Sequence, residues 1–326
     1  MDKLLQLRAP VENDLKQFSE LFDEVLVSSN PLLQKVFDHV RQRKGKMMRP
    51  TLIMLMARLL GEINERTFRS AVSLELLHTA SLIHDDVVDE SMERRGMPSV
   101  NALFHNKVAV LSGDYVLASS LMQASLVNSP VIISLISRLG RELADGELIQ
   151  LNNISSSEVS EDVYFDIIRK KTAALFSTCA AVAACSVDAA EEAVGFASTL
   201  GELIGICFQI RDDIFDYFDT SGTIGKPTGN DMREGKLTLP AIYAYHRAAG
   251  DKRIEQLVQR IKSQKATSEE IHEMIDFSVA QGGIEYAEQR MEELKKGAKF
   301  MLSTYPDSPV RGALEAYIDY VSERKS

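Results

Sequence analysis

Two short acidic segments of the sequence combine residue types and spacing that could bind a divalent metal. Each segment holds three aspartates at positions i, i+1 and i+4 between apolar residues: Asp85, Asp86 and Asp89 in LIHDDVVDE, and Asp212, Asp213 and Asp216 in FQIRDDIFDY. On a helix, positions i and i+4 lie one turn apart on the same face, so like charges there repel unless a cation lies between them. Carboxylate oxygens suit Mg²⁺, which keeps several waters and takes further ligands from a substrate phosphate. The pattern therefore predicts two helix faces that bind Mg²⁺ together with a phosphorylated substrate.

The alternative interpretation of such a cluster is a solvated acidic helix face. For one DDxxD segment taken alone, that interpretation is the better one. Two copies are harder to explain in this way, because a solvated face would not follow Leu82-Ile83 or Phe208-Gln209-Ile210. His84 beside Asp85 would suit a histidine-aspartate phosphohydrolase, but the second cluster contains no histidine, which argues against that class.

Basic residues lie where phosphates would need them. Two precede a helix expected to begin near Pro50, and helix N-termini themselves favour anions. Others follow the first aspartate cluster, lie between the clusters, or bracket the glycine-rich loop after the second. They are Lys46 and Arg49, Arg94 and Arg95, Lys171, and Lys226 and Lys236. Taken singly, each is best explained as a surface residue, but together they predict two diphosphate sites, one bridged by metal and one held by cations alone.

The elements that position these residues are expected to be helices. Pro50 in a first turn and Gly61 just past the end delimit one helix, and apolar residues recur with a helical period over residues 67–89. Two further helix starts are indicated by capping-box spacing: Ser155 with Glu158, and Thr267 with Glu270. Loops are expected at three places: residues 94–99, 152–157 and 219–235. Because no alternating β-branched run is bounded by hairpin turns, the sequence predicts an all-α fold.

The composition fits a globular protein and excludes several classes of partner. Of the 326 residues, 45% are hydrophobic and 26% are charged, and the formal net charge of −10 makes nucleic acid an unsuitable partner. The first residues lack the apolar stretch of a secretory signal, and the uncharged run between Lys171 and Asp188 is too short and too weakly apolar for a membrane span. Three cysteines without metal-ligand spacing favour reduced thiols. We expect a cytoplasmic protein without a transmembrane segment.

The order of these motifs resembles that of the trans-isoprenyl (polyprenyl) diphosphate synthases over roughly Gly45 to Pro240. The resemblance is carried by GKMMRP, ELLHTASLIHDDVVDESMERRG, SGDYVLASS, GELIQL, KKTAALF, FQIRDDIFDY and GKPTGNDMREGKLTLP. Two aspartate motifs with Lys-Thr between them are highly specific. There is one departure, because related enzymes usually have Gly-Gly-Lys-Arg where this sequence has Lys44-Gly45-Lys46-Met47. The cations at Lys46 and Arg49 remain.

The resemblance implies a role for each matching position. The principal Mg²⁺ ligands would be Asp85, Asp89 and Asp212, supported by Asp86, Asp213 and Asp216. The diphosphate of isopentenyl diphosphate would be bound by Lys46, Arg49, His78 and Arg95, and that of the allylic substrate by Arg94, Lys171 and Lys226. Lys236 is a further substrate-binding position. Thr172 and Gln209 match positions near the allylic carbon, where oxygen dipoles would stabilise developing positive charge. His78 also has a simpler interpretation as a packed core residue, although it lies only two turns before Asp85 on the same helix.

The same resemblance implies an isoprenoid synthase-like helical bundle around a deep central cavity. It would form one domain over residues 1–326, with a catalytic core at about 40–245 and C-terminal helices at 250–326 packed on it. A homodimer with two or three Mg²⁺ ions in each active site is implied. The reaction would join isopentenyl diphosphate head to tail to an allylic diphosphate such as farnesyl diphosphate. The product would be released at a membrane surface and serve as a quinone side chain.

The chemistry expected of such a site begins with ionisation of the allylic carbon–oxygen bond. Metal ions and lysines stabilise the departing diphosphate, and apolar walls keep water from the carbocation. The released diphosphate is the best candidate for the final base. A terpene cyclase would ionise the same kind of substrate, but Lys46, Arg49 and Arg95 imply a second diphosphate site. A non-catalytic subunit could dispense with one aspartate cluster, yet both clusters are complete.

The helix of the first aspartate cluster also predicts product length. Residues one to two turns before Asp85 would line the tunnel for the growing chain: Leu77, Ala80 and Ser81. In related short-chain enzymes an aromatic residue near these positions blocks the tunnel, whereas Ala80 and Ser81 are small, which implies a hexaprenyl to decaprenyl product, with octaprenyl as the best match. The floor is expected from a facing helix: Ile132, Leu135 or Ile136. The alternative is that Ala80 and Ser81 are small because a neighbouring helix packs there.

Overall fold

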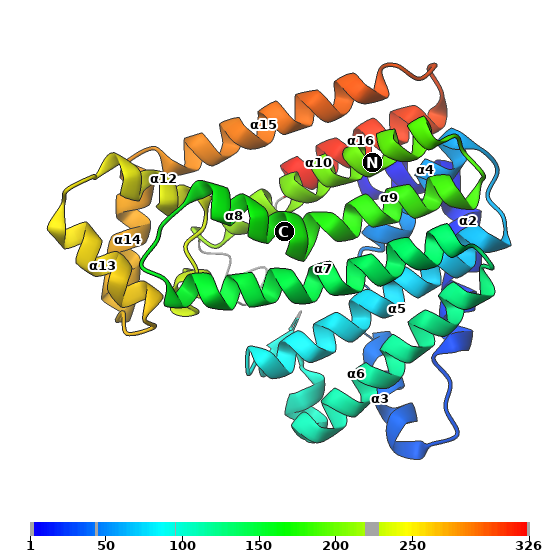
Figure 1. Cartoon of the computed structure of the whole chain (residues 1–326), viewed down its shortest axis with the longest axis horizontal. Coiled ribbons are helices and arrows are strands. Elements are labelled where there is room, and N and C mark those ends of the chain that lie inside the picture. Colours follow the sequence, from blue (N-terminus) through cyan, green and yellow to red (C-terminus); the bar gives the residue numbers. More distant parts are fainter. Residues whose placement is uncertain (1–2, 43–44, 95, 219–227, 325–326) are drawn as a thin grey trace. The chain divides into compact units, whose positions relative to one another are not determined.

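The computed structural model describes residues 3–42, 45–94, 96–218 and 228–324. Regular structure in these residues is almost entirely helical (Figure 1). The exception is a two-residue antiparallel hairpin in which β1 (Glu93–Arg94) pairs with β2 (Met97–Pro98). The all-α prediction is confirmed.

The chain forms two compact units, each assembled from separate stretches. The first unit comprises residues 1–140, 176–201 and 305–317, and the second comprises residues 141–175, 202–304 and 318–326. The helices α7 (Pro130–Ser155), α10 (Glu191–Phe215) and α16 (Pro309–Glu323) contribute to both. The expectation of a single domain with its C-terminal helices packed on a core stays a prediction.

The remaining helices of the first unit run from the N-terminus to the middle of the chain. They are α1 (Lys3–Arg8), η1 (Ala9–Val11), α2 (Glu12–Val25), α3 (Pro31–Gln42), α4 (Met48–Leu60), α5 (Glu65–Val88), α6 (Val100–Leu126) and, from its third residue onward, α9 (Ala174–Ser186). In the second unit they are α8 (Glu161–Ile168), the π-helical turn η2 (Arg169–Ala173), α11 (Asn230–Arg233), α12 (Leu239–Arg247), α13 (Lys252–Lys262), α14 (Ser268–Ala280) and α15 (Gly283–Leu302).

The two predicted helices of the first unit form close to their expected bounds. In α4, Pro50 lies in the first turn, and the Gly61 amide closes the helix on Ala57 O at 2.8 Å. The next helix, α5, begins after Asn64, whose side chain accepts from the Thr67 amide in a capping box. It packs lengthwise against α6 (Figure 1). This packing fixes the helix that carries the first aspartate cluster.

Small residues bring two other helices of the first unit close together. On α9, Cys179 and the alanines that follow it are buried. A Cβ added at Gly201 of α10 would lie 2.5 Å from Phe176 O of α9, so only glycine fits at this crossing. Most of the uncharged run between Lys171 and Asp188 therefore forms a buried helix.

The second unit confirms one predicted helix start and overturns another. Thr267 and Glu270 form a reciprocal capping box at α14, which packs against α12 and α15. The capping box predicted at Ser155 is wrong, because Ser155 is the last residue of α7 and its hydroxyl donates to Leu151 O at 3.4 Å. The next helix, α8, is capped instead by Ser160, whose hydroxyl accepts from the Val163 amide.

The predicted loops are partly helical. The first four residues of the stretch 152–157 continue α7, and residues 230–233 form α11 within the predicted loop 219–235. Residues 219–227 of that loop lie outside the described part of the chain. Of the described helices, only α10 is long and apolar enough to span a membrane by length and composition, and 44% of its most apolar window is buried. Core helices of folded proteins meet the same criteria.

Candidate active site

The first aspartate cluster occupies the end of α5. Asp85 is half-buried, Asp89 is exposed at the C-cap, and Asp86 is only 1% exposed. Arg94 Nε donates to Asp86 Oδ1 at 2.6 Å, and Asn101 Nδ2 donates to Asp86 O at 3.1 Å. Within the first unit, the structure thus brings Arg94 to the middle aspartate, while Asp85 and Asp89 remain one helical turn apart.

Two of the predicted cations of the isopentenyl diphosphate site, Lys46 and Arg49, lie just before α4 and in its first turn. Arg49 Nε and Nη2 donate to the carboxylate of Glu75 on α5 at 2.9 and 2.8 Å. Burial lowers the pKa of Arg49, but the charge and hydrogen bonds of Glu75 outweigh this and raise it above its ordinary value. Lys46 is exposed, and its carbonyl accepts from Arg8. The side chains of Arg49 and Glu75 are 16% and 20% exposed, so this guanidinium is held in a largely buried pair.

His78 lies on α5 one turn after Glu75. Its side chain is half-buried, and its carbonyl accepts from the Ser81 hydroxyl at 2.9 Å. Met47, which precedes α4, adopts a left-handed backbone with φ of 44°, unusual for a residue other than glycine. Backbone strain of this kind is concentrated at functional sites, and here it immediately follows Lys46.

The second aspartate cluster occupies the end of α10 in the second unit. Asp212, with a side chain 40% exposed, pairs with Arg324 Nη2 at 2.5 Å. The carboxylate oxygens of Asp216 accept hydrogen bonds from the backbone amides of Asn230 and Asp231, each with an N–O distance of 2.9 Å. The second cluster therefore carries one exposed carboxylate and one that caps the short helix α11.

Asp213, the middle residue of that cluster, is only 4% exposed. Tyr164 Oη donates to its Oδ2 at 2.6 Å, and Gln209 Nε2 donates to its Oδ1 at 2.8 Å. Burial raises the pKa of Asp213 to about 7, although the hydrogen bonds from Tyr164 and Gln209 act in the opposite direction. Its predicted role as a supporting metal ligand stays a prediction.

The Lys-Thr motif lies on the π-helical turn η2, where π-helical geometry often marks a functional site. Lys171 Nζ forms an ion pair with Glu147 of α7. Thr172 Oγ1 donates to Gln209 Oε1 at 2.6 Å. Thr172, Gln209 and Asp213 are therefore joined directly within the second unit, which the sequence did not indicate.

The remaining predicted positions are less informative. Lys236 Nζ pairs with Glu234 at 2.5 Å, and Arg95 and Lys226 lie outside the described residues. Leu77 and Ala80 of the predicted tunnel wall are 3% and 1% exposed, and Ser81 is half-buried. Ile132 and Ile136 are fully buried, whereas Leu135 is half-buried. A tunnel role for these residues stays a prediction.

Sequence reasoning missed four residues that contact predicted site residues: Glu75, Glu147, Tyr164 and Arg324. Glu75 interrupts the buried stretch AVSLELL, and an isolated charge among apolar residues was a usable signal. Glu147 lies within the quoted motif GELIQL, but its partner is distant in sequence. Nothing local marks Tyr164 or Arg324, because their contacts depend on chain folding.

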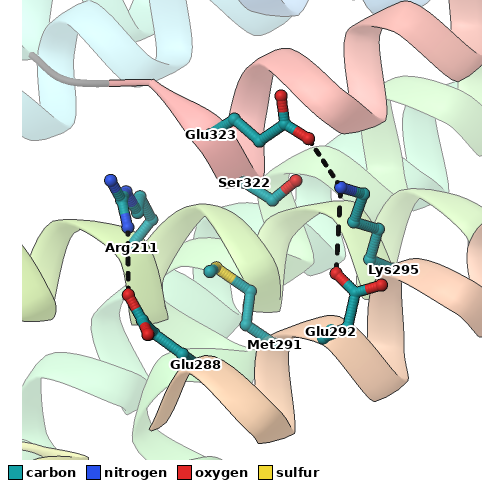
Figure 2. A pocket seen from close by; sticks show the side chains of 7 residues that line it. All are labelled: Arg211, Glu288, Met291, Glu292, Lys295, Ser322 and Glu323. Carbon is teal, nitrogen blue, oxygen red and sulfur yellow. Dashed lines mark hydrogen bonds and ion pairs between the residues drawn. The ribbon is translucent and has the colours of Figure 1, made fainter. Parts of the chain in front are cut away.

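A polar pocket of about 410 Å³ is lined by residues of α10, α15 and α16, among them Arg211, which precedes Asp212 in the sequence (Figure 2). Its two cations are already paired. Lys295 Nζ contacts Glu323 at 2.8 Å, and Arg211 Nη1 is 3.9 Å from Glu288 (Figure 2). Because the cations are neutralised by their neighbours, this pocket is explained as a polar junction between helices.

The chemistry of the donors fits Mg²⁺. Asp85, Asp89 and Asp212 offer hard oxygens that are not deeply buried. At Asp212 the guanidinium of Arg324 contacts one carboxylate oxygen, Oδ1. Among the residues that the structure describes, no three acidic, histidine or cysteine side chains form a metal site by themselves. Such partial sites suit an ion that takes its remaining ligands from water and substrate phosphate.

Comparison with known proteins agrees with this chemistry. The family model described as Polyprenyl synthetase matches residues 30–277. An all-trans-nonaprenyl-diphosphate synthase (geranyl-diphosphate specific) from Rhodobacter capsulatus is 36% identical over 310 residues, which cover 94% of this chain and 93% of that protein.

Two solved structures extend the likeness to the fold. A geranylgeranyl pyrophosphate synthase from Bacteroides thetaiotaomicron is 51% identical, with a TM-score of 0.88 and coverage of 99% of this chain and 100% of the other. A polyprenyl synthase from Caulobacter crescentus, complexed with calcium and isoprenyl diphosphate, is 29% identical, with a TM-score of 0.93 and coverage of 99% and 98%. The chain belongs to the polyprenyl synthetase family and is a prenyltransferase of the trans-polyprenyl diphosphate synthase class.

Proposed function

We propose that this enzyme joins isopentenyl diphosphate head to tail to an allylic diphosphate in a Mg²⁺-dependent reaction, giving a long-chain all-trans polyprenyl diphosphate. The observation that carries the proposal is the second aspartate cluster, where Gln209 joins Asp213 to Thr172 by hydrogen bonds and Lys171, the residue before Thr172, is held by Glu147. A cation and oriented oxygen dipoles beside a metal-binding carboxylate suit the departure of a diphosphate from carbon.

Bound at Asp85, Asp89 and Asp212, Mg²⁺ would neutralise the allylic diphosphate as its carbon–oxygen bond breaks. Lys171 and Arg94 would add positive charge to the same group. Both cations are held by carboxylates, Lys171 by Glu147 and Arg94 by Asp86. Such pairs fix each cation before the substrate arrives, so less conformational entropy is lost on binding.

The second substrate would bind through cations that need no metal. Lys46, Arg49, His78 and Arg95 would hold the diphosphate of isopentenyl diphosphate, with Arg49 oriented by Glu75. The double bond of this substrate attacks the allylic carbon, a carbon–carbon bond forms, and a proton is lost. We assign that proton to the released diphosphate, the only base that the reaction itself places near the new bond.

The proposed product is hexaprenyl to decaprenyl, with octaprenyl as the expected length. Small, buried Ala80 and the nonaprenyl synthase relative support this length. A second candidate product is geranylgeranyl diphosphate, which is favoured by the 51% identical geranylgeranyl synthase. Farnesyl diphosphate is the proposed primer, and a quinone side chain is the proposed use of a long product.

We further propose a homodimer in the cytoplasm that releases its product at a membrane surface. Support for the dimer comes from a row of exposed apolar side chains along α6, with Leu111 69%, Met122 57% and Leu126 53% exposed. Apolar surface of this extent on one helix is expected to be covered by a partner, and we assign a second copy of this chain.

The test is incubation of the purified chain alone with Mg²⁺, farnesyl diphosphate and labelled isopentenyl diphosphate, with products resolved by chromatography. Polyprenyl diphosphates support the proposal. Hydrocarbons without label would indicate a terpene cyclase, and no turnover would indicate a non-catalytic subunit.

Asp85→Ala and Asp212→Ala are the matched variants, and each is expected to lower turnover by several orders of magnitude. Metal-free stability should hold or rise for Asp85→Ala, because repulsion in the cluster is relieved. It should fall by at most about 1 kcal/mol for Asp212→Ala, because a partly exposed pair with Arg324 is lost. Near-normal turnover in either variant would refute the hypothesis that these aspartates bind the Mg²⁺ that holds the allylic diphosphate.

A further inference from the structure

Three hydrogen bonds connect the Lys-Thr turn to a buried tyrosine that no motif includes. Thr172 Oγ1 donates to Gln209 Oε1 at 2.6 Å, Gln209 Nε2 donates to Asp213 Oδ1 at 2.8 Å, and Tyr164 Oη donates to Asp213 Oδ2 at 2.6 Å. Together they link α8, α10 and the turn η2. We propose that Tyr164 is a positioning residue, which sets the orientation of Gln209 and Thr172 toward the allylic substrate by fixing the Asp213 carboxylate. This inference rests on the proposed function, since it assigns Thr172 and Gln209 to the allylic carbon.

The polarity of this chain of hydrogen bonds carries the argument. Asp213 accepts hydrogen bonds at both carboxyl oxygens, and only the NH₂ end of the Gln209 amide can donate one, so the bond from Gln209 Nε2 to Asp213 Oδ1 directs the amide oxygen toward Thr172. The Thr172 hydroxyl must then use its one hydrogen on that oxygen. The lone pairs of the Thr172 hydroxyl oxygen then remain available to stabilise a developing carbocation. An amide turned the other way would present N–H groups at the same place, and their positive ends would oppose the charge that forms.

Tyr164 is placed to prevent that reversal. Its side chain is 5% exposed, and its ring meets Phe165 edge-on at a centroid distance of 5.3 Å. The hydroxyl is therefore held by a packed ring, and it occupies the Asp213 oxygen that Gln209 does not use. With that oxygen occupied, the carboxylate cannot rotate freely away from the amide. Buried networks with every member satisfied specify one arrangement of their side chains.

The informative variant is Tyr164→Phe, which removes only the hydroxyl. We expect kcat with farnesyl diphosphate and isopentenyl diphosphate to fall about 10- to 100-fold, because misplaced groups lose transition-state stabilisation. The KM for isopentenyl diphosphate should stay within about twofold, since that substrate contacts none of these residues. A loss of general structure would instead alter both constants.

The chain offers a matched control in Tyr286→Phe. Tyr286 Oη donates to both carboxylate oxygens of Glu161, at 2.8 and 2.9 Å, so this variant also removes a tyrosine–carboxylate hydrogen bond to α8. We expect Tyr286→Phe to keep the wild-type kcat while losing thermal stability comparably to Tyr164→Phe. An equal loss of kcat in the two variants would overturn the proposal, because a structural effect would then explain both.

A double-mutant cycle tests whether Tyr164 acts through Gln209. If it does, Tyr164→Phe with Gln209→Leu should be no slower than Gln209→Leu alone, whereas independent effects would multiply. Wild-type kcat in Tyr164→Phe, or multiplied losses in the double variant, would refute the positioning role. Failure of the proposed function is distinguishable, because the wild-type chain itself would then give no labelled polyprenyl product.

Discussion

Gly146 of α7 is the position at which one methyl group is expected to disturb the proposed allylic site most directly. A Cβ added there would lie 2.9 Å from Lys170 Cβ and 3.0 Å from Lys171 N. Ordinary contacts of a Cβ begin near 3.4 Å, and the obstructing atoms belong to the backbone region of η2 rather than to a flexible chain end. In Gly146→Ala, η2 must therefore move away from α7 by roughly half an ångström, taking Lys171 and Thr172 with it.

Two opposing effects set the stability of this variant. Replacing a helical glycine by alanine gains about 0.5–1 kcal/mol, whereas overpacking a buried contact costs about 1–3 kcal/mol. The expected net loss is therefore between about zero and 2.5 kcal/mol, which corresponds to a fall in Tm of at most a few degrees. A displacement of about 1 Å at a catalytic group typically costs 10²-fold, so a shift of half that size should lower kcat by roughly 10-fold.

The assay compares kcat and Tm of Gly146→Ala with those of two other helical glycines. Gly195 is exposed on α10, with no atom within 4 Å of its added Cβ, so Gly195→Ala should keep kcat and hold or gain stability. Gly201→Ala would meet Phe176 O at 2.5 Å and should lose more stability than Gly146→Ala. Wild-type kcat in Gly146→Ala, at whatever Tm, would refute the claim that α7 sets the position of η2.

Three further results are expected. Glu75→Gln should lower the free energy of unfolding by about 1–3 kcal/mol in urea titration and raise the KM for isopentenyl diphosphate, because Arg49 loses the charge that holds it in a largely buried pair. An unchanged KM would show that Arg49 does not bind that substrate. Ala80→Phe should cap the product at about three to four isoprene units by chromatography, provided the site tolerates the added volume; unchanged long products from a folded variant would show that Ala80 does not face the tunnel. Leu111→Glu should convert the proposed dimer to monomer in sedimentation analysis, because the charge would be buried against the partner; a dimer of wild-type stability would place the interface elsewhere.

The sequence by itself determined the features that depend on neighbouring residues. Apolar periodicity predicted α5 to within two residues at its start. Gly61 marked the end of α4, because the last carbonyl groups of a helix need a donor, which the Gly61 amide supplies to Ala57 O. The Thr267 capping box is equally local, since both of its hydrogen bonds span three residues. Paired aspartate motifs with Lys171-Thr172 between them were specific enough to indicate the class of chemistry. Where local rules competed, as at Ser155, the prediction failed, because a serine hydroxyl can bond within a helix as well as begin one.

Only the tertiary structure decided which partners these residues take. Glu75, Glu147 and Arg324 neutralise groups 26, 24 and 112 residues away in sequence, and no local pattern encodes such pairings. The same holds for Tyr164, which reaches Asp213 across 49 residues and thereby fixes the direction of the Gln209 amide. A motif specifies which side chains are present, whereas burial and long-range packing decide which oxygens are already bonded and which remain for metal and substrate. The difference between two aspartates that are adjacent in sequence, Asp212 partly exposed and Asp213 buried in hydrogen bonds, arises from the helical rotation that turns one toward solvent and the other toward α8.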